Sequence, residues 1–259
     1  MLIFQPAHFK LRKHFEKWLN ETGFYQKFHF YNLGITSVYG PKLSPRIWDM
    51  TFWFCCFGFY GKYFSRFLKT YKSDFVFVDV GANAGLYSLI AGQNHYCVRS
   101  HCFEPDPTTS RFLTKNIELN NAKNISAHHY AIADKRGQKQ VSVNQYHSGS
   151  LSLDAPSPTV EERYTVSIEC VNASDLSDII PTTEQELIIQ IDVEGHERVV
   201  IGELLKCEFA QHIEHVYFEA GGSRENIETS IDLLTKAGFV TLHHSNVFGH
   251  KNIHMVRSR

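Results

Sequence analysis

Apolar runs along this 259-residue chain repeatedly end in an acidic residue, and a turn and a helical pattern follow each of them. The run at 75–78 has no polar break, which is typical of a strand buried on both faces of a parallel sheet. Leu86, Leu89 and Ile90 then recur at helical spacing. The same order recurs in three further stretches, at 101–104, 187–192 and 215–219. The pattern predicts an α/β fold, with a parallel sheet, helices on both of its faces and right-handed crossovers.

Other strands show a weaker pattern of alternating apolar residues. They are predicted at 125–132, 137–143, 150–153, 164–171, 239–242 and 253–256. The second and third of these form a hairpin-like excursion with a tip rich in Ser, Gly and Asn, and the last two are expected to pair antiparallel. The helix after residue 104 is predicted to begin with Asp106 as its N-cap and Pro107 at its first position.

The chain before this pattern is rich in aromatic residues, so two regions are predicted: an extension at 1–72 and the α/β domain at 73–259. A helix is expected near the start of the extension because four apolar residues share one face. These are Leu11, Phe15, Trp18 and Leu19. Its basic residues allow two interpretations, a helix packed on the main domain and an interfacial helix on an anionic membrane. The aromatic residues at 48–67 are expected to fill the core, and some of them to line a substrate pocket.

Composition narrows the class of protein. The formal net charge of -1 gives no electrostatic case for binding nucleic acid. The six cysteines form no C-x-x-C pair, which favours reduced thiols and a cytoplasmic location. Lys10, Arg12 and Lys13 interrupt any signal-peptide core, and no apolar run is long enough to predict a transmembrane segment. Peripheral membrane contact through the extension stays open as an alternative.

The turn after the first apolar run carries the first chemical signal. Its sequence, G-A-N-A-G, has Asn83 where the dinucleotide fingerprint requires a second glycine for close approach to a pyrophosphate. No P-loop lysine follows, which argues against a nucleoside triphosphate. Glu104, at the end of the second strand, can accept hydrogen bonds from both hydroxyls of a ribose. Together these features suit a nucleoside ligand without a pyrophosphate, and S-adenosylmethionine is such a ligand.

Four acidic residues end the four apolar runs. They are Asp79, Glu104, Asp192 and Glu219. In a parallel sheet these ends gather at one edge, where ligands bind in α/β folds. Several carboxylates buried close together are costly unless a cationic or hydrogen-bonding group lies among them. We therefore expect a ligand site at this edge.

Three blocks of the chain resemble one known family. V-D-V-G-A-N-A-G-L-Y-S, F-E-P-D-P with L-x-x-N-I-E-L-N, and I-D-V-E-G-H-E-x-x-V-I-x-G are similar to the FkbM-type methyltransferases, within the class I S-adenosylmethionine-dependent group. The resemblance covers about residues 75–219, and the third block is its most specific part. It implies a doubly wound, mostly parallel seven-stranded sheet of the Rossmann-like type. Residues 148–151 also resemble a serine-rich stretch of the family, whereas 61–63 lacks an acidic residue that family members often carry.

The resemblance also implies the residues that bind the cofactor. The methionine part would lie over the first strand and its glycine turn, the ribose on Glu104 and its neighbours, and the adenine beside a later strand. The cofactor-binding residues implied in this way are Asp79, Gly81, Ala82, Asn83, Gly85, Glu104, Pro105, Asp106, Ala131 and Ile132.

The resemblance implies methyl transfer, for which the acceptor oxygen, the methyl group and the sulfur must be aligned. We predict an O-methyltransferase that acts on a hydroxyl of a saccharide, a glycan precursor or a related small molecule. An aliphatic hydroxyl needs a base. The candidates are Glu194 and His196, with Asp192 as an orienting or cofactor-side acid. Alternatively, these three residues could cap the following helix or bind a divalent cation. We do not favour a metal ion, and the predicted site includes none.

Two other functions stay open. One is a catalytically inactive module that binds the cofactor or acts as a scaffold through its aromatic extension. The other is a nicotinamide-dependent oxidoreductase, against which Asn83 argues.

Overall fold

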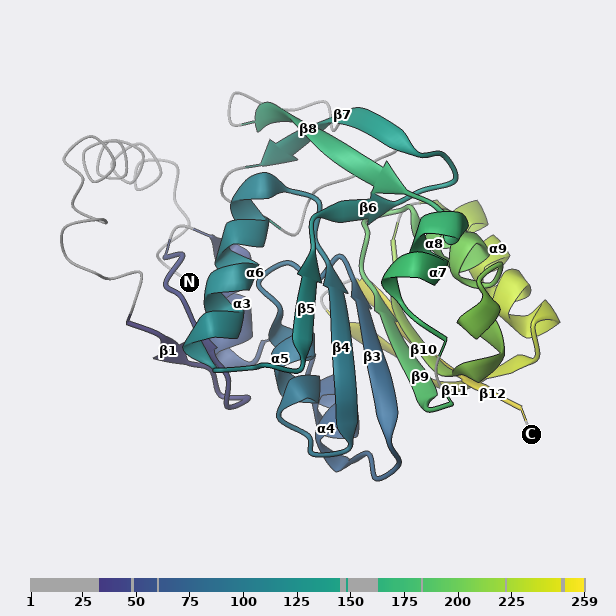
Figure 1. The fold of residues 1–259 in the computed structure, drawn as a ribbon, viewed down its shortest axis with the longest axis horizontal. Coiled ribbons are helices and arrows are strands. Elements are labelled where there is room, and N and C mark those ends of the chain that lie inside the picture. The colour runs from purple at the N-terminus through teal and green to yellow at the C-terminus, as the bar shows by residue number, and fades with distance from the viewer. Residues whose placement is uncertain are drawn as a thin grey trace.

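A seven-stranded sheet forms the centre of the molecule (Figure 1). The computed structural model describes residues 33–47, 49–59, 61–144, 148, 163–182, 184–221, 223–247 and 250–258. The strands of the sheet are β3 (Phe75–Val80), β4 (Cys97–Phe103), β5 (Ile125–His128), β9 (Glu186–Ile191), β10 (Ile213–Ala220), β11 (Phe239–Val247) and β12 (His250–Arg257). Their order is β11-β12-β10-β9-β3-β4-β5.

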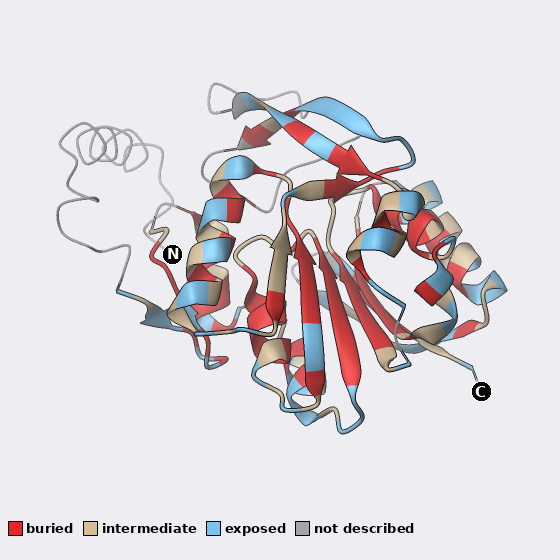
Figure 2. Cartoon of the chain, viewed as in Figure 1, coloured by how far each residue is buried: buried red, intermediate tan, exposed pale blue. Residues whose placement is uncertain are grey.

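All strands from β10 to β5 run parallel, and β12 runs antiparallel to both of its neighbours. This confirms the predicted α/β fold, the mostly parallel seven-stranded sheet and the antiparallel pair at the end of the chain. The strand at 75–80 lies in the middle, and every one of its residues is buried (Figure 2). Its unbroken apolar run therefore reflects a strand that is covered on both faces.

Helices cover both faces of the sheet (Figure 1). They are α3 (Met50–Phe57), α4 (Lys62–Thr70), α5 (Leu86–Gly92), α6 (Pro107–Leu119), α7 (Ala173–Ile179), α8 (Glu197–Leu204) and α9 (Arg224–Lys236). Successive residues of β3 point to opposite faces: Phe75 and Phe77 pack with α3 to α6, whereas Val76 and Val78 pack with α7 to α9. Burying one such side chain contributes about 1.5–3 kcal/mol. Asp106 caps α6 and Pro107 begins it, as predicted.

A second, three-stranded sheet lies beyond the carboxyl ends of the central strands (Figure 1). It consists of β6 (Tyr130–Ile132), β8 (Arg163–Val171) and β7 (Gly137–Asn144), in that order. The prediction of one strand at 125–132 is therefore wrong, because the chain leaves the central sheet at His129 and β6 pairs with β8. The partner of β7 is β8, and the strand predicted at 150–153 lies outside the described residues.

The described part of the N-terminal extension is joined to the central sheet by a shared core. It contains the paired strands β1 (Ile35–Thr36) and β2 (Lys42–Leu43), followed by α3 and α4. Phe64 of α4 is fully buried and stacks on Tyr217 of β10, with ring centroids 4.1 Å apart. The helix expected around 11–19 lies outside the described residues, and the boundary between residues 72 and 73 stays a prediction.

No helix in the described part of the chain is long and apolar enough to cross a membrane.

Buried histidines lie between α4 and the sheet. His254 is fully buried, and its Nδ1 lies 3.0 Å from the hydroxyl of Tyr63. Burial, together with the nearby His215 and His243, lowers the pKa of His254 to about 3. Burial also lowers the pKa of His215 to about 4. Each ring is therefore neutral in the folded protein at a pH where an unfolded chain protonates it.

From these buried histidines we predict that the folded protein loses stability in acid. Between about pH 6.5 and 4 the unfolded chain binds more protons than the folded one, so the free energy of unfolding falls as the pH falls. We expect His254→Gln, which keeps a polar group for Tyr63, to reduce this slope by about 1.4 kcal/mol per pH unit. Urea unfolding followed by circular dichroism at several pH values measures it. The exposed His244→Gln is the control, and equal slopes in wild type and His254→Gln would contradict the prediction.

Candidate functional site

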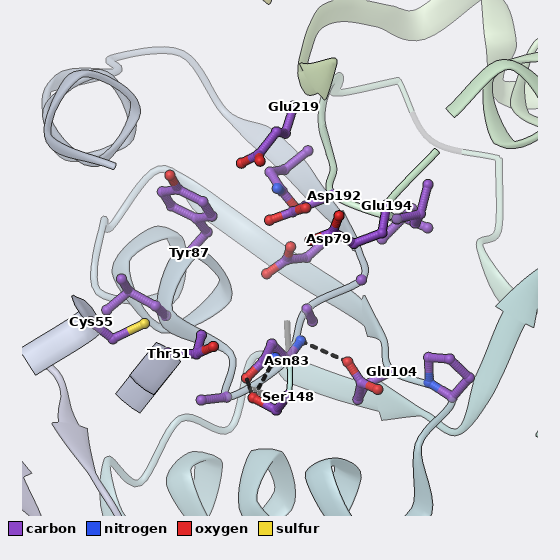
Figure 3. A pocket seen from close by; sticks show the side chains of 18 of the residues that line it. Thr51, Cys55, Asp79, Asn83, Tyr87, Glu104, Ser148, Asp192, Glu194 and Glu219 are labelled. Carbon is purple, nitrogen blue, oxygen red and sulfur yellow. Dashed lines mark hydrogen bonds between the residues drawn. The ribbon is translucent and has the colours of Figure 1, made fainter. Parts of the chain in front are cut away.

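A cavity of about 500 Å³ opens at the carboxyl ends of the central strands. This volume falls within the range of small-molecule sites. All four acids that end the predicted strands line it, namely Asp79, Glu104, Asp192 and Glu219, and their carboxylates are drawn in Figure 3. The topology explains why, because β3, β4, β9 and β10 are neighbouring parallel strands whose ends meet at this edge.

Asp79 lies in β3 beneath the cavity, and its exposed fraction is only 1%. Its Oδ2 accepts hydrogen bonds from the backbone nitrogen of Ser88, at 3.0 Å, and from the Ser88 hydroxyl, at 2.6 Å. Its Oδ1 is buried and has no hydrogen-bond partner among the described residues. Burial raises the pKa of Asp79 to about 6, although both bonds from Ser88 oppose this shift. A cationic group of a ligand would complete this site.

The glycine turn is held in direct contact with the loop after β9. Gly81 has φ +79°, and a Cβ placed on it would lie 1.9 Å from the carbonyl oxygen of Asp192. Its nitrogen and that of Ala82 both donate to the carbonyl oxygen of Phe103, at 3.0 and 2.9 Å. Gly85 also has φ +79°, and a Cβ there would lie 2.5 Å from the side chain of Leu113. Both positions therefore require glycine.

Glu104 follows β4 and is held by two backbone nitrogens. Its Oε1 accepts from the nitrogen of Asp106 and its Oε2 from that of Asn83, each at 2.9 Å. Burial raises the pKa of Glu104 to about 7. The side chain of Asn83 contacts the hydroxyl of Ser148, with Nδ2 and Oγ 2.9 Å apart (Figure 3). The carboxylate is thus fixed in orientation on the cavity wall.

The remaining residues that the resemblance implied for the cofactor divide into two groups. Pro105, Ala131 and Ile132 line the cavity beside Glu104. Asp106 is not among the lining residues: it caps α6 and accepts from the nitrogen of Thr109 at 2.8 Å and from its hydroxyl at 2.7 Å. Its carboxylate is therefore engaged in holding the helix.

The loop after β9 carries the three residues predicted for catalysis. Asp192 and Glu194 line the cavity, and Glu194 adopts φ +53°, a left-handed conformation that is uncommon for a residue with a side chain. Strained residues of this kind cluster at functional sites. His196 precedes the first residue of α8, is buried, and is not among the residues that line the cavity.

Glu197 fixes the shape of this loop, a role that the sequence did not indicate. It is buried, its Oε1 accepts from the nitrogen of Gly195 at 2.9 Å, and its Oε2 accepts from Nδ2 of Asn226 at 2.5 Å. Asn226 in turn donates to the carbonyl oxygen of Gly221 at 3.0 Å. The last acid of the I-D-V-E-G-H-E block therefore joins the loop to the beginning of α9.

Other residues of the cavity wall were not predicted. Gln190 lines the cavity two residues before Asp192, and its only sequence signal is a polar residue within an apolar run. Asn252 of β12 and Tyr87 of α5 line it without any such signal. Phe54 and Phe59 of the aromatic extension also line it, as expected for part of that segment. Among the described residues, no three His, Cys, Asp or Glu side chains are grouped so that they could hold a metal ion.

The chain matches the Methyltransferase FkbM domain over residues 79–241. Methyltransferase 1 from Beauveria bassiana is 24% identical over 184 residues, which cover 65% of this chain and 74% of that protein. The crystal structure of methyltransferase FkbM from Methylobacillus flagellatus is 18% identical, with a TM-score of 0.49, and the match covers 72% of this chain and 44% of that one. TrmK from M. capricolum, in complex with S-adenosyl-homocysteine, is 10% identical with a TM-score of 0.45, over 77% of this chain and 70% of that one.

The family assignment follows from the domain match, which spans well over half of the 259 residues and contains the glycine turn, Glu104 and the loop after β9. It agrees with the sheet order and with the position of the cavity. The chain therefore belongs to the FkbM methyltransferase family, and it is an S-adenosylmethionine-dependent methyltransferase.

Proposed function

We propose that this enzyme transfers the methyl group of S-adenosylmethionine to a hydroxyl of a saccharide, a glycan precursor or a related small molecule. The observation that carries this proposal is the pair of acids on the wall beside the glycine turn. Asp192 and Glu194 line the cavity, and the carbonyl oxygen of Asp192 touches the turn at Gly81. A carboxylate in that position can take the proton of an acceptor hydroxyl.

The residues on the other side of the cavity fit the cofactor. The buried Oδ1 of Asp79 suits a cationic group, Glu104 suits the hydroxyls of a ribose, and Ala131 and Ile132 offer apolar contact to a flat base. Gly81 lets the carbonyl oxygen of Asp192 approach the backbone of the turn, which holds the loop after β9 against this side of the cavity. When bound, the cofactor supplies a methyl group on a positively charged sulfur.

We assign the base to Glu194. It lines the cavity, whereas His196 does not, and its left-handed backbone holds it at the turn of the loop. The acceptor oxygen would lose its proton to the Glu194 carboxylate while it takes the methyl group. Asp192 would orient the acceptor, and the aromatic wall formed by Phe54 and Phe59 would keep water from the reacting atoms. Alignment of this kind contributes up to about 7–11 kcal/mol in model reactions.

We also propose a cytoplasmic location for the enzyme. All six cysteines are free and buried thiols, which suits a reducing compartment. Peripheral membrane contact through the extension stays a prediction, since the helix it depends on lies outside the described residues.

The base assignment predicts a selective loss of turnover. Glu194→Gln keeps the size of the side chain but removes the proton acceptor, so kcat should fall by roughly 10²–10⁴-fold. The dissociation constant for S-adenosylmethionine should change less than about threefold, because Glu194 is assigned to the acceptor. Transfer of tritiated methyl groups to a panel of methyl glycosides measures the first quantity, and calorimetry the second.

His196→Gln is the matched variant in the same loop. Its turnover should stay within about fivefold of wild type if the protein keeps its melting temperature. Full activity of Glu194→Gln, or a larger loss in His196→Gln with an unchanged fold, would contradict the assignment.

The ribose assignment predicts a pH-dependent cofactor affinity. Hydroxyls donate to the ionised form of Glu104, whose pKa burial raises to about 7. Affinity for S-adenosylmethionine should therefore weaken as the pH falls from 8 to 6.5, because binding must then displace a proton. Glu104→Gln should weaken binding by about tenfold to a hundredfold at pH 8 and remove most of this dependence. Calorimetry with Glu118→Gln, an exposed change on α6, as control measures both effects; an unchanged pH profile in Glu104→Gln would rule the assignment out.

A further inference from the structure

Two polar side chains on neighbouring strands face the cavity at its end away from Glu104. Glu219 of β10 and Asn252 of β12 are direct partners in the antiparallel ladder, so their side chains lie on the same face of the sheet. Both line the cavity, and Figure 3 shows the carboxylate of Glu219 beside that of Asp192. Glu219 is 7% exposed and Asn252 is 4% exposed. Neither has a part in the reaction described above.

The strand register places this pair on the acceptor side of the site. Phe218 pairs with Ile191 in the parallel ladder of β10 and β9, so Glu219 and Asp192 follow side by side. At the end of β10, a Cβ placed on Gly221 would lie 3.0 Å from the nitrogen of Gly195, next to Glu194. The strands β9 and β3 separate β10 from β4, which positions Glu104. Glu219 therefore lies near the proposed base and away from the proposed ribose site.

Tyr217 sets the orientation of the Asn252 amide. Its hydroxyl donates to Oδ1 of Asn252 at 3.0 Å, which identifies Nδ2 as the donor end of this cavity-lining amide. Burial, together with Glu219 and Asp192, raises the pKa of Tyr217, which keeps the phenol protonated as a donor. Stacking on Phe64, with centroids 4.1 Å apart, holds the ring in place. A carboxylate acceptor and an amide donor are thus fixed next to each other.

An independent feature of the same wall also indicates a polar ligand. Gln190 pairs with Tyr217 in the ladder of β9 and β10 and lines the cavity. Its Oε1 is buried and has no hydrogen-bond partner among the residues that the structure describes. A buried acceptor of this kind is costly unless a ligand donates to it. An apolar acceptor molecule would leave this oxygen without compensation.

We propose that Glu219 and Asn252 together bind a second hydroxyl of the acceptor, adjacent to the hydroxyl that is methylated. A hydroxyl both donates and accepts, so it satisfies the carboxylate and the amide at once. The acceptor class is then a polyol with neighbouring hydroxyls, and a simple alcohol or a phenol with one hydroxyl is disfavoured. This inference rests on the proposed function and names the substrate class of that same site. Glu219 and Asn252 are specificity-determining residues in this assignment, and Tyr217 is a positioning residue.

The test compares an acceptor with its deoxy analogues. The methyl hexopyranoside with the highest turnover is assayed beside the monodeoxy analogues that lack one hydroxyl next to the methylated position. Wild type should prefer the parent over one of these analogues by about tenfold to a hundredfold in kcat/KM. Glu219→Gln and Asn252→Ala should lose most of this preference, mainly through a higher KM for the parent. Tyr217→Phe should lose part of it.

Controls separate this role from a structural one. Glu214→Gln, on the same strand but not among the cavity-lining residues, should keep the preference of wild type. All variants should bind S-adenosylmethionine with a dissociation constant within about threefold of wild type, which shows that the site is folded. If Glu219→Gln and Asn252→Ala bind the cofactor and keep the preference for the parent, the pair has no such role.

The results distinguish a failure of the proposed function from a failure of the inference about Glu219 and Asn252. A wild-type enzyme that binds S-adenosylmethionine but methylates no hydroxyl in the panel overturns the O-methyltransferase proposal, and the inference about the pair falls with it. Methylation of phenols or simple alcohols in preference to every polyol keeps O-methylation and overturns the pair alone.

Discussion

The contact between Gly81 and the carbonyl oxygen of Asp192 is the constraint on which the rest of the site depends. A Cβ at residue 81 would lie 1.9 Å from that oxygen, and the nitrogen of Asp192 also donates to the carbonyl oxygen of Val80 at 2.9 Å. The turn after β3 and the loop after β9 are therefore in direct backbone contact. Methyl transfer needs donor and acceptor aligned to within a fraction of an ångström. Joining the two loops by backbone rather than by side chains gives that alignment a rigid basis.

The burial of two acids in the site carries an electrostatic cost that ligands would offset. Asp79 and Glu104 both have a raised pKa because burial penalises their charged forms. Bonds from Ser88, Asn83 and Asp106 offset only part of this cost. A cationic group near Asp79 and hydroxyls at Glu104 would offset more. In the proposed binding mode, cofactor affinity is coupled to the ionisation of these acids, and perturbed pKa values of this kind are frequent at functional sites.

The sequence predicted the parts of the structure that depend on local pattern. The apolar runs placed the parallel strands, and the acid after each run placed the cavity, because parallel strands carry their ends to one edge. The break at His129 was missed, since alternation continues while the chain passes from one sheet to another. Asn252 was missed because its position depends on the register of β12 against β10, which no local pattern encodes. No local pattern showed whether His196 or Glu194 faces the cavity, because this depends on the left-handed backbone at Glu194.

In the proposed function, the elements that hold the donor and those that contact the acceptor come from different parts of the chain. The proposed cofactor side is built from β3, β4 and their turns, whereas Phe54 of α3 and Phe59, just after that helix, supply the aromatic wall. Asp49 joins the two sides, since its Oδ1 accepts from the nitrogen of Thr51 at the start of α3 and from that of Ser148, which contacts Asn83. Arg46 holds the other oxygen of Asp49 at 3.3 Å. These polar contacts add to an apolar one, because Phe52 and Cys55 of α3 belong to the same buried core as Ala82 of the glycine turn. The aromatic wall and the glycine turn are therefore held together by both kinds of contact.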